Sequence, residues 1–224
     1  MKIPNCVGII LDGNRTWAKN KGLPKLEGHR VGLQTLKATT LFVRDAGVKH
    51  LVVYMFSTEN WGREPLEVSY LLDLFRSSIK NEISELGKEG VRIRFVGQRE
   101  RFSKDLQEAM ESTEKDTENN SGITLWACMS YGGRAEITQA VKSLINSGEE
   151  ITEENISKNL WTSGMPDPDI IIRTSGQMRL SGFLAWQSIY SELFFIKTLW
   201  PDFSKEEFEK ILTEYNDREI KLGK

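Results

Sequence analysis

The stretch that decides the fold is Cys6-Val-Gly-Ile-Ile-Leu-Asp-Gly-Asn-Arg-Thr-Trp-Ala-Lys19, close to the N-terminus. Its apolar run, residues 7–11, predicts a buried strand, because turn formers flank it and it is too short for a helix. The strand delivers Asp12 to a turn, and a helical pattern opens at about Arg15.

A carboxylate at the end of a strand, followed by the N-terminus of a helix, suits the binding of a diphosphate. The backbone N–H groups and the helix dipole attract the anion, and Asp12 can hold a Mg²⁺ that bridges to it. The alternative is that Asp12 is only a helix N-cap and Gly13 only a tight turn. Both interpretations are compatible with this stretch alone.

Strand-like and helical patterns alternate along the rest of the chain. Further strands are expected at residues 48–56, 91–96, 123–129, 169–172 and 189–195. Helices are expected at residues 28–46, 66–88, 102–118, from after Gly133 to about Ser147, at 153–160 (capped by Thr152) and at 205–217. This alternation predicts one α/β domain over residues 1–224, with a mostly parallel six-stranded sheet flanked by helices.

Composition excludes several classes of function. The chain has 224 residues and a net charge of −2, so it lacks the basic field that nucleic-acid binding needs. Cys6 and Cys128 lie in predicted buried strands without metal-ligand spacing, which indicates reduced core residues. No apolar run approaches the roughly 20 residues of a membrane span. We expect a cytoplasmic protein.

Ligands of parallel α/β sheets bind beyond the carboxyl ends of the strands. That rule brings together four loops, at residues 12–17, 56–63, 129–134 and 173–182. The loop Phe56-Ser-Thr-Glu-Asn-Trp-Gly-Arg63 supplies hydroxyls, a carboxylate, an amide and a guanidinium. His29 lies at the start of the helix predicted for residues 28–46, one loop away from Asp12.

The loop after the fifth predicted strand carries two arginines, Arg173 and Arg179. Two guanidinium groups beside hydroxyls make a diphosphate clamp, since arginine binds phosphate oxygens bidentately and stays charged. The alternative for Arg173 is a structural ion pair with Glu192 or Asp169. Together with the acidic and basic side chains of the other loops, the clamp favours a Mg²⁺-dependent enzyme that acts on diphosphates.

The helices predicted at residues 28–46 and 66–88 are apolar along one face. They could line a hydrophobic tunnel between themselves and the sheet, or they could be ordinary core helices. If there is a tunnel, Leu72 and Phe75 are expected to influence the length of an apolar product.

Several motifs occur in a fixed order over most of the chain. They are Asp-Gly-Asn-x-x-Trp-Ala-Lys (12–19), Gly-His (28–29), Phe-Ser-Thr-Glu-Asn-Trp (56–61), Tyr-Gly-Gly-Arg (131–134), Arg-Thr-Ser-Gly (173–176), Arg-Leu-Ser (179–181), Phe-Leu-x-Trp-Gln-Ser (183–188), Tyr-Ser-Glu-Leu-Phe-Phe (190–195) and Leu-Trp-Pro-Asp-Phe (199–203). In this order and spacing, the sequence resembles the cis-prenyltransferase family.

The resemblance implies that isopentenyl diphosphate is condensed repeatedly onto an allylic diphosphate, such as farnesyl diphosphate, with Mg²⁺ as cofactor. By position, it implies catalytic roles for Asp12, His29 and Asn60, and a metal site at Asp12 and Glu192. The implied substrate-binding residues are Gly13, Asn14, Arg15, Trp17, Lys25, His29, Phe56, Ser57, Thr58, Glu59, Trp61, Arg63, Arg173, Arg179 and Ser181. Among them, Arg173, Arg179 and Ser181 match the clamp for isopentenyl diphosphate.

The resemblance further implies a homodimer without a transmembrane segment that makes transient contact with the inner face of the membrane. The product expected is a long polyprenyl diphosphate of the undecaprenyl type, used as a glycan carrier lipid. The sequence departs from the family at Arg15-Thr16, where a second loop arginine is usual, and at Val7, Met178 and Gly182. The alternatives are a short-chain or irregular prenyl coupling enzyme, or a non-catalytic regulatory member of the family.

Overall fold

The computed structural model describes residues 2–218 and contains one six-stranded sheet, in which every neighbouring pair of strands is parallel. The strands are β1 (Cys6–Ile10), β2 (His50–Ser57), β3 (Val91–Val96), β4 (Ile123–Tyr131), β5 (Ile170–Arg173) and β6 (Glu192–Phe195). Their order across the sheet is β3-β4-β2-β1-β5-β6. The predicted α/β fold is therefore confirmed, and the sheet is wholly rather than mostly parallel.

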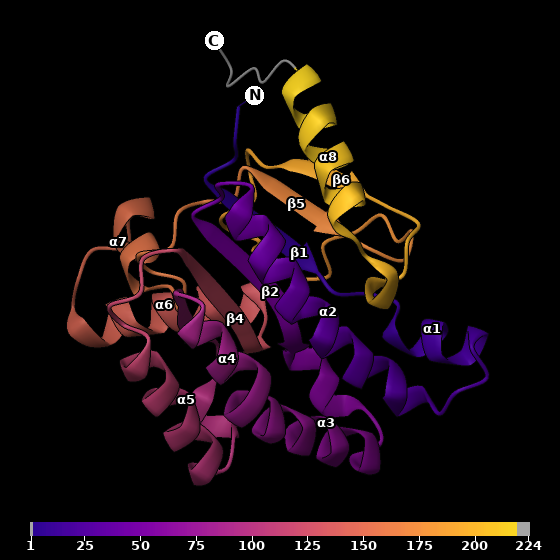
Figure 1. Ribbon diagram of the computed structural model, residues 1–224. Helices are drawn as coiled ribbons and strands as arrows, with labels where there is room; N and C mark the ends of the chain where they lie inside the picture. The colour runs from indigo at the N-terminus through magenta and orange to yellow at the C-terminus, as the bar shows by residue number, and fades with distance from the viewer. Residues whose placement is uncertain (1, 219–224) are drawn as a thin grey trace.

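The helices cover both faces of this sheet (Figure 1). They are α1 (Asn14–Asn20), α2 (Lys25–Asp45), α3 (Pro65–Ser78), α4 (Ser84–Lys88), α5 (Lys104–Asp116), α6 (Gly133–Ser147), α7 (Glu153–Asn159) and α8 (Lys205–Asp217). A π-helical turn, Ile79–Ile83, joins α3 to α4, and short 3₁₀ turns span Thr58–Gly62, Arg99–Arg101 and Trp200–Asp202.

The central strand β1 shows why the chain folds into three layers. All five of its residues are buried, and successive side chains point to opposite faces. Val7 and Ile9 join the core that α2, α3, α5 and α8 cover. Cys6 and Ile10 join the second core, on the other face, with Phe183 and Leu184. Both cysteines are free and buried, as predicted.

Most predicted elements are observed with shifts of a few residues. α2 begins three residues before the predicted start, and α5 is shorter at both ends. β6 begins at Glu192 rather than at residue 189, because residues 181–190 form turns. The N-cap of α1 is Gly13, which has a φ of 107° and no side-chain cap, so the interpretation of Asp12 as an N-cap is wrong.

Helix α1 packs very closely on α2 through two glycines. A Cβ atom at Gly28 would lie 2.0 Å from the Asn14 carbonyl oxygen, and one at Gly32 would lie 2.3 Å from Asn14 Oδ1. The Trp200 indole donates a hydrogen bond of 2.8 Å to the Gly32 carbonyl from the other side. These contacts hold the start of α1 against the carboxyl end of β1. Within residues 2–218, no helix combines the length and hydropathy of a membrane span.

The Gly28 contact predicts a steric effect on stability. Gly28→Ala should lower the free energy of unfolding by about 1–3 kcal/mol, since the new methyl group would overlap the backbone carbonyl of Asn14 and force α1 and α2 apart. Urea denaturation measures the change. The matched control is Gly62→Ala, where a Cβ would meet nothing within 4 Å. Equal stability of the two variants would contradict the close packing of α1 on α2.

Candidate functional site

A cavity of about 650 Å³ opens at the carboxyl ends of the central strands. Its polar end is lined by side chains and backbone from the predicted loops, namely Asp12, Asn14, His29, Ser57, Thr58, Glu59, Asn60, Arg63, Gly132, Gly133, Arg134, Arg173, Ser181 and Gly182. Its apolar end is lined by Ile10, Leu33, Met55, Leu71, Leu74 and Phe75. The cavity therefore joins a charged mouth to an apolar interior between the sheet and helices α2 and α3.

Asp12 is held rigidly at the polar end by three backbone hydrogen bonds. Its N–H donates to the Thr174 hydroxyl oxygen at 2.9 Å, and that hydroxyl donates to the Asp12 carbonyl at 2.6 Å. The Trp200 N–H donates to the same carbonyl at 2.9 Å. The carboxylate itself is 35% exposed and accepts a hydrogen bond of 2.8 Å from Arg173 Nη2.

Arg173 connects Asp12 to the loop that follows β5. Its side chain is only 5% exposed, and its Nη1 donates to Ser181 Oγ at 2.8 Å and to the Arg179 carbonyl. The alternative of a structural ion pair between Arg173 and Glu192 or Asp169 is wrong, because Glu192 pairs with Arg218 and Asp169 accepts hydrogen bonds from the backbone of residues 5 and 6. The Arg179 side chain is exposed and bonds to Gln177, so only its carbonyl reaches Arg173.

The loop after β2 is built around a reciprocal cap. Asn60 Oδ1 accepts the Ser57 N–H at 3.1 Å, which closes the 3₁₀ turn. Arg63 then donates to Glu67 Oε1 at 2.9 Å, and Arg15 reaches the same carboxylate at 3.4 Å. Glu67 thus holds together two cations, one from α1 and one from the loop, beside the mouth of the cavity.

His29 faces the cavity from α2 as a neutral imidazole. Burial, reinforced by the positive charge of Arg63, lowers the pKa of His29 to about 4. Its Nε2 is buried and has no hydrogen-bond partner in residues 2–218. A neutral imidazole with a free nitrogen can accept or donate a hydrogen bond to a ligand. Asn14 Oδ1 is buried in the same unpartnered state.

Several residues predicted to bind substrate do not line the cavity. Trp17 donates to Asp202 at 2.7 Å on the outer side of α1. Phe56 is 1% exposed and packs edge-to-face on Trp61 and Phe75 within the core. Trp61 donates to Ser130 Oγ at 2.8 Å. Gly13, Arg15, Lys25 and Arg179 also lie outside the lining.

Glu192 is not brought near Asp12 within one chain. It pairs in register with Ile170, which pairs with Val7, so it lies at the amino end of the sheet. Five residues separate Val7 from Asp12, roughly 16 Å along an extended strand. No group of three or more His, Cys, Asp or Glu side chains able to hold a metal occurs in the described part of the chain.

Three lining or neighbouring residues were missed by the site prediction: Tyr54, Glu67 and Arg134. The Tyr54 hydroxyl donates to the carbonyl oxygens of Tyr131 and Ser181, which ties the loops together. Glu67 could have been found from its i, i+4 spacing to Arg63. Arg134 belongs to a quoted motif, but its exposed position at a helix start gave no signal of its own.

The environment of His29 predicts its titration. We expect the His29 imidazole to stay neutral from pH 8 to 6 and to titrate near pH 4. Because the unfolded pKa is near 6.5, stability contributed by neutral His29 is present above pH 6.5 and is lost toward pH 4, at no more than about 1.4 kcal/mol per pH unit. Proton NMR resolves this easily, since the chain has two histidines.

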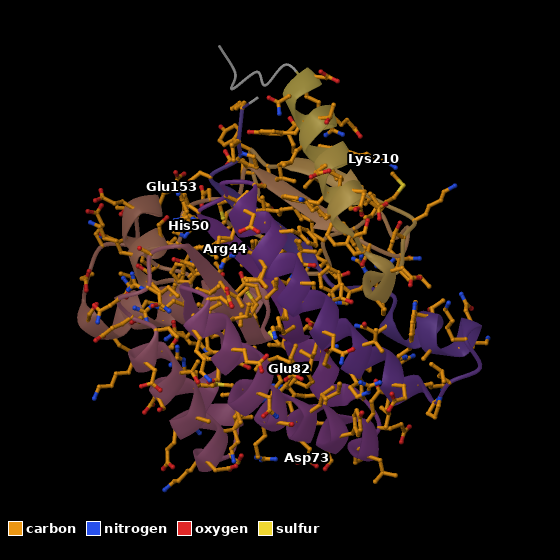
Figure 2. All side chains as sticks on the ribbon, viewed as in Figure 1. Arg44, His50, Asp73, Glu82, Glu153 and Lys210 are labelled. Carbon is orange, nitrogen blue, oxygen red and sulfur yellow. The ribbon has the colours of Figure 1, made fainter. Side chains whose placement is uncertain are left out.

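His50, labelled in Figure 2, lies at the start of β2, at the end of the strand opposite to the cavity, and its Nδ1 accepts a hydrogen bond of 3.2 Å from the Trp126 indole. His50→Gln assigns the two signals, and His29→Gln should remove the additional loss of stability at acidic pH. A His29 signal that titrates at its ordinary value near 6.5 would contradict the buried, neutral imidazole.

Comparison with known proteins identifies the family of the chain. The family described as "Putative undecaprenyl diphosphate synthase" matches residues 10–223. The isoprenyl transferase of Fusobacterium nucleatum is 46% identical over 99% of this chain and 96% of its own length. That of Thermotoga maritima is 43% identical over 100% of this chain and 98% of its own length.

Two solved structures extend the comparison to three dimensions. Lavandulyl diphosphate synthase from Lavandula x intermedia, in complex with dimethylallyl diphosphate, has a TM-score of 0.94 at 29% identity, over 99% of both chains. A probable undecaprenyl diphosphate synthase from Campylobacter jejuni has a TM-score of 0.85 at 29% identity, over the full length of both chains. The chain belongs to the undecaprenyl diphosphate synthase family of cis-prenyltransferases.

Proposed function

We propose that this prenyltransferase condenses isopentenyl diphosphate with an allylic diphosphate, such as farnesyl diphosphate, in a Mg²⁺-dependent reaction. The observation that carries the proposal is one cavity in which Asp12 and Arg173 stand at a charged mouth and aliphatic side chains form the interior. A diphosphate matches the mouth, and a prenyl chain matches the interior. A regulatory protein would not need both.

Asp12 fits the role of the Mg²⁺ ligand. Mg²⁺ is usually bound through one or two carboxylates together with substrate phosphates rather than in an all-protein cage. A single, half-buried carboxylate at the mouth meets that requirement. The bound ion would offset the negative charge that develops on the departing diphosphate. Arg173 would have to exchange Asp12 for a phosphate oxygen when both ligands enter.

The other lining residues would bind the two substrates, orient them and exclude water. Arg173 and Ser181 would hold the isopentenyl diphosphate, while Asn14 and Arg63 would contact the allylic diphosphate. Neutral His29 and Asn60 would orient the substrates through hydrogen bonds. Leu33, Leu71 and the other aliphatic residues would keep water from the allylic carbon as its bond to the diphosphate lengthens.

We also propose a homodimer formed through the β6 edge. Ile189 and Tyr190 are more than 70% exposed there, and Leu193 is 36% exposed. Exposed apolar side chains on an unpaired sheet edge mark an interaction surface. Since Glu192 lies too far from Asp12 in one chain, any contribution of Glu192 to a metal site would have to come from a second copy. Release of an apolar product would involve transient contact with a membrane.

The length of the product depends on the closed end of the cavity. Met55 and Phe75 line both the cavity and a tightly filled apolar cluster beyond it, which contains Ile79, Ile83, Phe95 and Met129. One isoprene unit occupies roughly 115 Å³ at the packing density of a protein interior. The 650 Å³ cavity would therefore hold roughly five units at most.

We propose that the enzyme makes a long polyprenyl diphosphate of the carrier-lipid type. The growing prenyl chain would pass Met55 when the side chains at the closed end of the cavity move aside. The volume favours a second candidate, a short or medium-length product. A third candidate is the irregular coupling of short prenyl units, because the structure is similar to that of lavandulyl diphosphate synthase, with a TM-score of 0.94.

Activity is tested by incorporation of labelled isopentenyl diphosphate with farnesyl diphosphate and Mg²⁺. Asp12→Asn should lower turnover by about 10²–10³-fold, because charge on the leaving group is no longer offset at a preorganised site. Asp73→Asn, an exposed residue of α3, is the control and should leave turnover unchanged. Wild-type protein that consumes no isopentenyl diphosphate with any allylic primer would overturn the proposal.

Product length is tested at the closed end. Met55→Ala should shift the product ladder upward by one or more isoprene units, since it opens the wall toward the cluster beyond. Leu72, predicted from sequence to act with Phe75, packs against the core without lining the cavity, so Leu72→Ala should leave the ladder unchanged. Mass spectrometry of the products decides, and a ladder that responds to Leu72 but not to Met55 would contradict this assignment.

A further inference from the structure

The first turn of α6 forms part of the polar cavity wall. Gly132, Gly133, Arg134 and Ala135 all line the cavity, beside Ser181 and Gly182. The Gly133 N–H donates to the Gly182 carbonyl at 2.7 Å, which joins this turn to the loop that carries Ser181. Glycine is needed at position 132, since a Cβ there would lie 2.5 Å from Thr58 Oγ1. The turn is thus pressed against two loops of the site.

This turn presents free backbone donors and the Arg134 cation to the cavity. The N–H groups of Arg134 and Ala135 donate to no acceptor within residues 2–218. Because Gly133, Arg134 and Ala135 line the cavity, the positive end of the α6 dipole lies at the mouth, with the buried Glu136 carboxylate in the same turn. Arg134 adds a full positive charge at the helix end where a cation is disfavoured. It forms no ion pair with any described residue, including Glu59 of the same lining.

A second group in the same cavity is also unsatisfied. The side chain of Arg173 lines the same mouth and is only 5% exposed. Its Nε atom has no hydrogen-bond partner among the described residues. Its Nη atoms reach Ser181 and Asp12. The N–H groups at the start of α6, the Arg134 guanidinium and the spare N–H of Arg173 are donors that suit an anion bound among them.

A buried carboxylate fixes the geometry of this wall. Glu136, one turn into α6, is completely buried and accepts hydrogen bonds from the Tyr131 hydroxyl at 2.5 Å, Gln187 Nε2 at 3.1 Å, and both the N–H and hydroxyl of Thr162 at 2.9 and 2.8 Å. Tyr131 and Gln187 flank the two lining segments, 132–135 and 181–182. Glu136 therefore fixes the positions of both segments through these hydrogen bonds, although it does not itself line the cavity.

We propose that the first turn of α6 completes the second diphosphate site, with Arg134 in contact with the isopentenyl diphosphate and Glu136 as a positioning residue. The inference rests on the proposed function, because it assigns the ligand of the clamp formed by Arg173 and Ser181. The N–H groups of Arg134 and Ala135 bind phosphate oxygens, and the Arg134 guanidinium closes the site from the side opposite Arg173.

The test measures binding of isopentenyl diphosphate, with Mg²⁺, by titration calorimetry, and the KM of both substrates in the condensation assay. Arg134→Ala should weaken isopentenyl diphosphate binding and raise its KM by about tenfold or more, the effect of one lost charge-assisted contact. The KM for farnesyl diphosphate should stay within about twofold. Lys142→Ala, an exposed cation on the same helix, is the control and should change neither.

Glu136→Gln tests the positioning role, since an amide would aim a donor at neighbours that are themselves donors. It should raise the KM for isopentenyl diphosphate with little change in kcat, and Glu136→Asp should recover part of the loss. Circular dichroism confirms that each variant is folded.

The possible failures are distinct. Wild-type protein that binds no isopentenyl diphosphate overturns the proposed function itself. Wild-type binding that survives Arg134→Ala unchanged overturns this inference alone. A Glu136→Gln variant that loses thermal stability while keeping both KM values would make Glu136 a structural residue only.

Discussion

The ion pair between Asp12 and Arg173 is the interaction on which the site depends. It joins residues 161 positions apart, at the carboxyl ends of adjacent strands β1 and β5. Arg173 is almost fully buried, so its charge would be costly without a nearby anion. Asp12 supplies that anion because Thr174 and Trp200 fix its backbone. Asp12, which lies just beyond the carboxyl end of β1, is thereby held at the mouth of the cavity.

The same pair couples the two halves of the site. In the proposed function, a cation at Asp12 and a phosphate at Arg173 would each weaken the bond between these two side chains, so each ligand would favour binding of the other. Coupling of this kind is reciprocal in free energy. Glu67 stands in a similar relation to Arg15 and Arg63, since its carboxylate pairs with both guanidinium groups beside the mouth of the cavity. The departure from the family at Arg15-Thr16 therefore sits beside a carboxylate that sequence comparison alone does not connect to it.

Periodicity and the rule for strand ends predicted much of this arrangement. Alternating patterns located all six strands, and the rule placed Asp12, Ser57 and Arg173 at one edge. The failures concern side-chain direction and register. The indoles of Trp17 and Trp61 donate hydrogen bonds to Asp202 and Ser130, partners far away in sequence. Glu192 begins a short strand, and only the pairing of β5 with β6 shows that it lies at the opposite edge.

The cavity's two ends follow from the layers that form it. The polar loops lie at the ends of the strands, where the chain leaves the sheet. The space between the sheet and helices α2 and α3 is instead bounded by the apolar faces of the sheet and of these helices. A ligand with a charged head and a hydrocarbon tail satisfies both environments at once. The π-helical turn Ile79–Ile83 lies at the closed end, where Ile79 and Ile83 pack behind Phe75. Such a turn holds one more residue than an α-helical turn, so it shifts the side chains that follow it around the helix. The closed end of the cavity is thus formed by Met55 and by Phe75 of α3, with Ile79 and Ile83 of the π-helical turn packed behind them.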